Sequence, residues 1–462
     1  MKKTDILITG GGPAGFTCAL SAQNTYPKKK ITLIRKDKTA VIPCGIPYII
    51  STLEKPEDNI LGDKPLIDKG VEILVDEVVD FHENRAITAT GKEIEYEKLV
   101  LATGSQSISL PIKGAQLDGV YSVMKNFDFL QDFKRKIGEV NNVVIVGGGF
   151  IGFEVSDELL KLNKKVTIVE MTEHCLGFAF DDEFCELAEV EMRNTGADII
   201  AGKKVVEIKG NGSVSSVVLD DGTTLNADMV IFSIGYKPNV KLAEKLGLKI
   251  GESGAIWVDE YTRTSNSDVF AVGDCAEKKE FFSRNTMKLM LASTAMAEGR
   301  LAGSNLYSLK VVREFKGTLG TFSTRFGNLS LGECGLTEKQ AKRFGFEYVV
   351  GRAEVPDRHP GKIKDATKLK VKLIFSSPYS HVLLGGQIAG GKSVGEITNI
   401  LSVMIQKGFT DVEIDTLQIG THPLLTSSPI AYPIINATVD AILKHYGNME
   451  RPKKEALADY VS

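Results

Sequence analysis

Two segments of the chain repeat one pattern: an apolar run, a glycine-rich turn, a helical stretch and a second apolar run. The first turn is GGGPAG at residues 10–15 and the second is GGGFIG at residues 147–152. Both fit GxGxxG between β-branched strands, the context that marks a dinucleotide-binding βαβ unit. The first glycine allows the tight turn, the second lets a pyrophosphate approach, and the third lets helix and strand pack closely. The repeat therefore predicts two dinucleotide sites in an α/β fold.

The two copies differ where the second strand ends. Glu170 ends the second copy, at the place where a carboxylate binds the ribose hydroxyls of the adenosine. At roughly 4 Å and an effective dielectric near 20 it would repel a 2′-phosphate by about 4 kcal/mol before screening. We therefore expect NADH rather than NADPH. The first copy ends in Arg35 and Lys36, with Asp37 as an alternative ribose ligand.

Composition excludes several classes of protein. At about 150 residues per domain, 462 residues suggest about three domains. A net charge of −3 gives no general electrostatic case for a nucleic-acid partner. No window approaches the roughly 18 apolar residues of a membrane span, and the N-terminal apolar run is too short for a signal peptide. The six cysteines contain no CxxC pair, so we expect no metal site, reduced thiols and a cytoplasmic location.

Three further motifs accompany the two glycine-rich turns: LATGS at 101–105, IGYKPN at 234–239, and a short strand that ends in Gly273 and Asp274. Together these segments resemble the FAD- and NAD-dependent pyridine nucleotide-disulfide oxidoreductase superfamily over nearly the whole chain. The resemblance implies FAD at the first turn, NADH at the second, and a hydrogen bond from Asp274 to the ribityl chain. It also implies a helix near residues 291–294 whose positive N-terminus faces the flavin and stabilises its reduced anion.

The same resemblance implies a glutathione-reductase-like α/β fold with two Rossmann-like domains and a C-terminal α+β dimerisation domain. We expect a discontinuous FAD domain (1–112 and 255–320), an NADH domain (113–254) and an interface domain (321–462). The residues implied to bind the two dinucleotides are Gly10, Gly12, Pro13, Ala14, Gly15, Arg35, Lys36, Cys44, Val78, Ala102, Thr103, Gly104, Gly147, Gly149, Phe150, Ile151, Gly152, Glu154, Glu170, Gly235, Gly273, Asp274, Ser293 and Thr294.

Cys44 stands where dithiol members of the superfamily carry two cysteines five positions apart. Here the positions five away are Thr39 and Ile49, so no intrachain disulfide can form at this point. The pattern resembles the single-cysteine branch: coenzyme A-disulfide reductases, NADH-dependent polysulfide or persulfide reductases, NADH oxidases and peroxidases. The resemblance implies electron flow from NADH through FAD to an oxidised Cys44, held as a sulfenic acid or a mixed disulfide. Since the thiolate is the reactive form, we expect a lowered pKa for Cys44.

Four more residues take roles from the resemblance. Phe150 stands where the family places an aromatic ring that covers the flavin, and Glu154 where a carboxylate contacts the nicotinamide. Tyr432 matches a tyrosine that disulfide reductases supply across a homodimer. His422 precedes Pro423 as in the His-Pro of the dithiol reductases, where the imidazole is an acid-base group from the partner subunit. A loop cap is the alternative role for His422.

The electron acceptor is the least constrained part of the hypothesis. Oxygen- and peroxide-reducing members carry a histidine in the first turn, where this chain has Pro13. Members that bind coenzyme A tightly carry a basic pair on the first helix, where this chain reads AQNT at 22–25. These departures favour polysulfide, persulfide or a small disulfide as acceptor, and coenzyme A stays open as a ligand.

The leading hypothesis is therefore a homodimeric FAD enzyme in which NADH reduces a small sulfur compound through Cys44. The alternatives are an NADH oxidase that forms hydrogen peroxide and a reductase of a redox protein such as rubredoxin. A module that only binds the dinucleotides is least favoured, because it leaves Cys44 without a purpose. We expect no nucleic-acid or membrane partner and no fused rhodanese domain.

Overall fold

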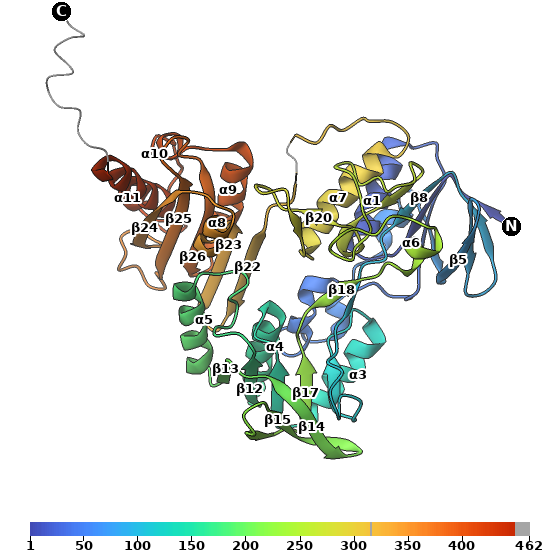
Figure 1. Ribbon diagram of the computed structural model, residues 1–462, viewed down its shortest axis with the longest axis horizontal. Helices are drawn as coiled ribbons and strands as arrows, with labels where there is room; N and C mark the ends of the chain where they lie inside the picture. Colours follow the sequence, from blue (N-terminus) through green and yellow to red (C-terminus); the bar gives the residue numbers. More distant parts are fainter. Residues whose placement is uncertain (315–316, 449–462) are drawn as a thin grey trace, which may run out of the picture. The chain divides into compact units, whose positions relative to one another are not determined.

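The computed structural model describes residues 1–314 and 317–448 (Figure 1). They form two compact units. Unit 1 comprises Met1–Cys175 and Arg193–Thr318, and unit 2 comprises Leu176–Met192 and the described residues from Leu319 onward. None of the described helices is both long enough and apolar enough to span a membrane.

The first parallel sheet of unit 1 carries the first glycine-rich turn. Its strands read as nearly continuous apolar runs because both faces are covered. In the sheet order they are β19 (Val269–Ala271), β8 (Lys98–Leu101), β2 (Ile6–Thr9), β3 (Ile31–Arg35) and β4 (Glu72–Val75). Helices α1 (Pro13–Thr25) and α7 (Ala292–Asn305) pack side by side (Figure 1). They approach closely at Gly299, where a Cβ would lie 2.5 Å from the carbonyl oxygen of Ala14.

The second parallel sheet repeats this arrangement. Its order is β10 (Val120–Ser122), β17 (Met229–Phe232), β11 (Asn142–Val146), β12 (Lys165–Glu170) and β13 (Asp198–Ala201). Strand β11 lies between β17 and β12 as β2 lies between β8 and β3. Helix α4 (Phe150–Lys161) connects β11 to the parallel strand β12, as α1 connects β2 to β3. The predicted pair of strand–turn–helix–strand units is therefore confirmed.

Smaller elements complete unit 1. One mixed sheet has the order β1 (Lys2–Lys3), β7 (Glu93–Glu95), β6 (Arg85–Thr88), β5 (Val78–His82), and an antiparallel one has β14 (Val205–Asn211), β15 (Ser213–Leu219), β16 (Thr224–Asn226). Strands β9 (Ser105–Ser107) and β18 (Tyr236–Pro238) pair with each other; β9 begins at the last residue of LATGS, and β18 lies within IGYKPN. The remaining elements are α2 (Lys64–Ile67), α3 (Phe127–Gly138), α6 (Lys241–Lys245), β20 (Lys278–Lys279) and β21 (Thr286–Met287).

Unit 2 is built on an antiparallel sheet. Its order is β22 (Thr321–Phe326), β23 (Leu329–Gly335), β26 (Leu383–Gly390), β25 (Lys368–Ser376) and β24 (Tyr348–Pro356). Helices α9 (Val394–Lys407) and α11 (Pro433–Asn448) cover one face (Figure 1). Shorter helices are α8 (Glu338–Arg343) and α10 (Asp411–Asp415). Leu176–Met192, which includes most of α5 (Asp182–Asn194), also belongs to this unit although it lies between β12 and β13 in the chain.

A row of polar side chains crosses the sheet of unit 2. The strand registers place Glu333, Gln387, Lys372 and Arg352 side by side on four neighbouring strands. Lys372 is only 3% exposed and contacts Asp181 at 2.8 Å, Glu183 at 3.0 Å, and Glu338. Gln387 donates to Asp181 Oδ2 at 2.6 Å and accepts from the Asp181 N–H at 2.8 Å.

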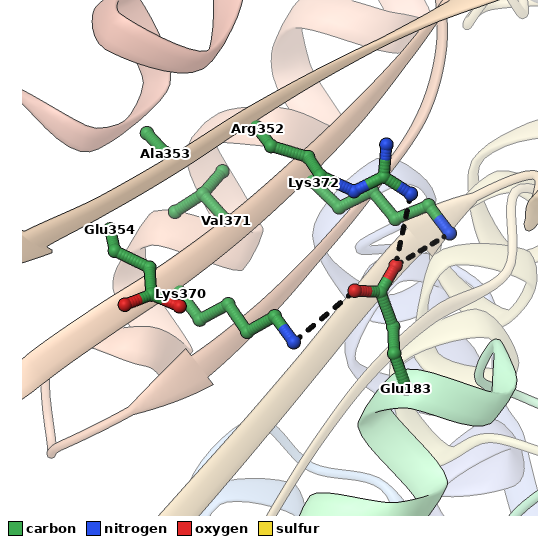
Figure 2. Close-up of a pocket in the computed structure, with 7 residues that line it drawn as sticks. All are labelled: Glu183, Arg352, Ala353, Glu354, Lys370, Val371 and Lys372. Carbon is green, nitrogen blue, oxygen red and sulfur yellow. Dashed lines mark hydrogen bonds and ion pairs between the residues drawn. The ribbon is translucent and has the colours of Figure 1, made fainter.

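Figure 2 shows Glu183, which projects from α5 toward Arg352, Lys370 and Lys372. Its carboxylate oxygens lie 3.3, 3.2 and 3.0 Å from the nitrogens of these residues, respectively. Burial opposes its charge, but the cations outweigh that effect and lower the pKa of Glu183 to about 2. The carboxylate pairs with all three cations, so the cluster fastens α5 to the sheet.

Glu333 is the exception in the row. It is 2% exposed, and its Oε1 has no hydrogen-bond partner among the described residues. Burial and the charge of Asp181 raise its pKa well above the ordinary value. Its unfolded form thus releases a proton at lower pH than its folded form, and stability falls as pH rises above the unfolded pKa of about 4.3.

We expect Glu333→Gln to remove this loss, because the amide imitates the neutral acid. The wild type should lose at most about 1.4 kcal/mol per pH unit relative to the variant above that pKa. Urea unfolding between pH 5 and 8 measures the difference. Glu186→Gln, an exposed position on α5, is the control. A constant difference between wild type and Glu333→Gln across this range would contradict the expectation.

Candidate functional site

The first glycine-rich turn joins β2 to α1 with almost no room for side chains. Gly10 has φ +116°, and a Cβ there would lie 2.0 Å from the Ala102 carbonyl oxygen. A Cβ on Gly15 would lie 2.0 Å from the Gly10 carbonyl oxygen. At Gly12, by contrast, a Cβ would meet nothing within 4 Å, and α1 begins at the next residue, Pro13. The unpaired N–H groups of the helix start thus face open space, which fits the pyrophosphate of FAD.

The end of β3 is braced by a buried ion pair. Arg35 is 7% exposed, and both of its terminal nitrogens donate to Asp63 at 2.6 Å. Asp37 accepts from the Asn126 amide at 2.7 Å, and Lys36 is exposed beside Glu77 at 3.3 Å. The two terminal nitrogens of Arg35 therefore have partners in the chain, whereas its buried Nε has none among the described residues. Val78, the other residue expected near this part of the site, is buried at the start of β5.

Asp274 lies in the turn that follows β19. Its Oδ2 accepts from Ser105 Oγ at 2.7 Å and contacts Lys125 Nζ at 2.9 Å. Burial opposes the charge, yet Lys125 and Ser105 outweigh it and lower the pKa of Asp274. The side chain is thus an ionised acceptor, and its hydrogen bond to the ribityl chain stays a prediction.

A second ion pair fixes the backbone of this turn. Glu298 on α7 accepts the Gly273 N–H at 2.8 Å and contacts Lys278 at 2.9 Å. Lys278, 3% exposed, also donates to the carbonyl oxygens of Gly273 and Ala276 at 2.7 and 2.9 Å. Buried charges that are paired and hydrogen-bonded on every side hold one geometry. Lys278 and Glu298 therefore act as positioning residues for Asp274.

Cys44 lies in a short 3₁₀ turn, η1 (Pro43–Gly45), and is exposed, whereas the other five cysteines are buried. The buried amide of Asn59 donates to the Ile42 carbonyl oxygen at 3.0 Å, and the Asn59 carbonyl accepts the Ile42 N–H at 2.9 Å. A Cβ on Gly45 would lie 1.9 Å from Asn59 Oδ1. Asn59 thus holds the turn through its two hydrogen bonds to Ile42. Its side chain lies so close to position 45 that a residue with a Cβ would overlap it.

The electrostatics around Cys44 differ from the sequence-based expectation. Desolvation by the surrounding chain, with the charge of Glu154, raises the pKa of Cys44, and Asp274 adds to the effect. Lys125 opposes it but is bound to Asp274. The expectation of a lowered pKa is wrong because desolvation by burial, with the charges of Glu154 and Asp274, outweighs the opposing charge of Lys125.

Glu158 fastens the segment after Cys44 to α4. It is fully buried and accepts from the N–H groups of Ser51 and Thr52 at 3.2 and 2.7 Å, and from Thr52 Oγ1 at 2.6 Å. Lys161 contacts the same carboxylate at 2.6 Å. The tie places η2 (Pro47–Ile49) against the helix that begins at Phe150 and carries Glu154. Burial and the charge of Glu154 raise the pKa of Tyr48, which lies in η2.

The second glycine-rich turn has the geometry of the first. Gly147 has φ +107°, and a Cβ there would lie 2.8 Å from the Ser233 carbonyl oxygen. A Cβ on Gly152 would lie 2.2 Å from the Gly147 carbonyl oxygen. Gly149 caps α4, whose first turn contains Phe150, Ile151 and Gly152. Glu170 ends β12 and accepts from the Gly148 N–H at 2.7 Å and the Thr172 N–H at 2.8 Å. Its carboxylate lies beside the turn, where a ribose is expected.

Two other motifs are tied to each other. Thr103 Oγ1 donates to the Asn239 carbonyl at 2.7 Å, and the Asn239 amide donates back to Thr103 at 2.9 Å. Gly104 and Gly235 have φ +65° and +98° in the turns beside this pair. Ser293 and Thr294 lie in the first turn of α7, as the sequence predicts for a helix N-terminus at this place.

His422 and Tyr432 belong to unit 2 and lie in the segment before α11. His422 is exposed, and its Nδ1 accepts the Leu424 N–H at 3.2 Å. In the neutral ring the proton therefore resides on Nε2. Tyr432 follows the 3₁₀ turn η5 (Pro429–Ala431), and burial raises its pKa.

The pyridine nucleotide-disulphide oxidoreductase family matches residues 4–299, and the dimerisation domain of that family matches residues 321–430. An NAD(P)H sulfur oxidoreductase (CoA-dependent) of Pyrococcus furiosus is 30% identical over 94% of this chain and 98% of its own length. An NADH oxidase of Methanocaldococcus jannaschii is 31% identical over 95% and 98%. The structure of an NAD-dependent persulfide reductase from A. fulgidus superposes with a TM-score of 0.89 at 27% identity, over 97% of this chain and 85% of that one.

The chain belongs to the pyridine nucleotide-disulphide oxidoreductase family and has its two Rossmann-like domains and dimerisation domain. It is an FAD-dependent NAD(P)H oxidoreductase, and the sequence-based family, fold and enzyme class are confirmed. The individual site residues and the domain boundaries stay predictions.

Sequence reasoning missed the residues that support the site from a distance. Lys125, Asn59, Glu158 and the pair Lys278–Glu298 lie outside the recognised motifs. Each acts through contacts between segments far apart in the chain, which no local pattern records. One signal was available in Gly45, a glycine directly after Cys44.

The close contact between Gly45 and Asn59 can be tested by adding a methyl group at position 45 and shortening the side chain at position 59. We expect Gly45→Ala to destabilise unit 1 by about 1–3 kcal/mol and to displace the cysteine turn, because the new methyl overlaps the Asn59 amide. Asn59→Ala alone loses a hydrogen bond worth about 1 kcal/mol. The double variant should be more stable than the sum of both effects predicts, and it should recover the rate at which Cys44 reacts with a disulfide reagent. Additive losses would mean that the two residues do not oppose each other.

Proposed function

We propose that the enzyme uses NADH to reduce sulfur–sulfur bonds in polysulfide, persulfide or a small disulfide through Cys44. The observation that carries the proposal is the single exposed thiol, on a turn of its own, without a second cysteine five positions away. The P. furiosus relative is named for sulfur and the A. fulgidus structure for persulfide, which supports the same acceptor class. In this proposal the domain boundaries are those expected from the motifs.

The proposed FAD site consists of the first glycine-rich turn with Arg35, Lys36 and Val78, the LATGS loop, Asp274 and the start of α7. The proposed NADH site consists of the second turn with Phe150, Glu154, Glu170 and Gly235. FAD, when bound, takes a hydride from reduced nicotinamide and passes its two electrons on, which no side chain here can do. The chain contributes binding, orientation and the reactive sulfur.

The chemistry of Cys44 then needs two steps. The thiolate attacks one sulfur of the acceptor, the sulfur–sulfur bond breaks, and the departing thiolate takes a proton while Cys44 keeps the transferred sulfur as a persulfide or mixed disulfide. Two electrons and one proton split the new bond, release hydrosulfide or a thiol, and restore the Cys44 thiolate. Burial and the charge of Glu154 raise the pKa of Cys44 and so oppose formation of its thiolate, whereas the charge of Lys125 favours the thiolate.

In the proposed homodimer, His422 and Tyr432 come from the second subunit. In the neutral ring Nε2 of His422 carries the proton, and this N–H can donate a hydrogen bond that stabilises a departing thiolate. The family's dimerisation domain supports the homodimer. The six cysteines without a disulfide support the cytoplasm as its location.

An NADH oxidase is the second candidate, favoured by the name of the M. jannaschii relative. Reduction of a redox protein such as rubredoxin would instead require turnover with a protein acceptor only. Coenzyme A, which appears in the name of the P. furiosus relative, is an alternative partner of Cys44. The mass of an adduct on Cys44 under non-reducing conditions separates coenzyme A, an extra sulfur and an extra oxygen.

The first test compares two acceptors for the wild type and Cys44→Ser. With polysulfide under anaerobic conditions, we expect NADH oxidation by the variant to fall to background, because the attacking sulfur is absent. NADH oxidation in air should persist, since reduced flavin reacts with oxygen without Cys44. Flavin absorbance shows whether the variant retains its cofactor. Unchanged anaerobic turnover in a flavin-loaded variant would refute the proposal.

The second test concerns Glu170. We expect the wild type to prefer NADH and Glu170→Gln to raise the ratio of kcat/KM for NADPH over NADH by at least about tenfold, since removal of a repulsion above about 1.4 kcal/mol has that effect. Steady-state kinetics with both nucleotides give the ratio. Glu173→Gln, exposed on the same loop, should leave it unchanged. Equal ratios in both variants would show that another group selects the nucleotide.

A further inference from the structure

Three residues in unit 2 gather around one carboxylate oxygen. Asp411 Oδ2 lies 3.0 Å from His381 Nδ1 and 3.2 Å from His445 Nδ1. His381 is in the turn between β25 and β26, Asp411 is the first residue of α10, and His445 is in α11. These residues play no part in the proposed sulfur chemistry. Cysteine spacing alone gave no reason to expect them to meet.

The hydrogen bonds of His381 show that a cation is needed at this point. Its Nε2 lies 2.7 Å from the carbonyl oxygen of Pro378, which can only accept, so Nε2 carries a proton. In the neutral ring Nδ1 then has a bare lone pair, and that lone pair faces the Asp411 carboxylate. Two lone pairs at 3.0 Å repel each other unless a positive charge lies between them. A metal ion or a second proton on His381 supplies that charge.

The His445 ring is free to change its orientation. His445 is 7% exposed, and its Nε2 has no hydrogen-bond partner within the described residues. No hydrogen bond on Nε2 therefore fixes the direction in which its Nδ1 points.

The three side chains are held as metal ligands usually are. The Pro378 carbonyl orients His381, and Asp411 Oδ1 accepts the Val412 N–H at 2.7 Å, which leaves Oδ2 for the ion. The Asp411 N–H donates to the His381 carbonyl at 3.0 Å and fixes these two residues relative to each other. The two nitrogen–oxygen separations are near the ligand–ligand spacing of roughly 3.3 Å around tetrahedral Zn²⁺ with bonds of about 2.0 Å.

We propose that His381, Asp411 and His445 bind a divalent transition-metal ion, with Zn²⁺ as the best fit, through both Nδ1 atoms and the carboxylate. The rings now stack with centroids 3.9 Å apart and planes at 21°, so one ring must turn to bring both lone pairs to one ion. His445 can turn most readily because its Nε2 is not held. The His381 side chain is 22% exposed and gives the ion a path from solvent. The ion would tie the β25–β26 turn to α10 and α11.

Zinc binding by the flavin-loaded enzyme tests the proposal, with a chromophoric chelator as competitor. Cys44→Ser is the background, because it removes the one exposed thiol that would compete for the metal. We expect one tight site per chain, and an affinity at least about tenfold lower in His381→Ala and in Asp411→Asn, since loss of a ligand exceeds the effect of losing an outer partner. His82→Ala, on β5 in unit 1, should bind like the background.

Cobalt gives a second measurement, in which the background protein provides a positive signal. Co²⁺ bound by the background protein should show the intense visible absorption of tetrahedral coordination, and that absorption should be absent in His381→Ala. A background protein that binds zinc no more tightly than its His381→Ala variant would overturn the proposal and leave a second proton on His381 as the cation. Both readouts are independent of NADH turnover, so they can fail while the proposed sulfur chemistry stands, and the reverse.

Discussion

The close backbone contacts at the two glycine-rich turns are the constraint on which unit 1 depends. At Gly10 and Gly15 the main chain lies where any side chain would overlap a carbonyl oxygen, and the same holds at Gly147 and Gly152. Each strand, turn and helix is therefore locked in one relative position. The start of each helix can then present its N–H groups to an anion, and the remaining site residues are arranged around these two starts.

The Asp274 turn illustrates this dependence. A Cβ on Gly273 would lie 2.8 Å from the Ala14 side chain, so the turn packs directly on the first helix. The buried pair of Lys278 and Glu298 keeps it there, and Lys125 joins Asp274 to the electrostatic surroundings of Cys44. Removal of any one of these charges changes the electrostatic energy of the others, because their interactions are only weakly screened inside the protein.

The sequence was sufficient for features that a short segment encodes. The repeated turns, the strand that ends at Glu170 and the absence of a second cysteine near Cys44 follow from local pattern. It was insufficient where segments distant in the chain meet. Arg35 is occupied by Asp63, and Gly45 is explained by Asn59, neither of which a motif reveals. The pKa of Cys44 was expected in the wrong direction because its burial, and the carboxylates of Glu154 and Asp274 near it, depend on segments distant in the chain.

The polar row of unit 2 has a consequence for how the chain is made. The partners of Lys372 and Gln387 come partly from Asp181 and Glu183, which precede the sheet by well over a hundred residues. During synthesis, the segment that contains Asp181 and Glu183 therefore leaves the ribosome long before strands β22–β26 are made. A fragment that begins at β22 would lack Asp181 and Glu183 and would leave Lys372 with Glu338 as its acidic partner. Sequence comparison matches the dimerisation domain as one continuous segment, residues 321–430. The folded unit also contains Leu176–Met192, which comes from the middle of the chain.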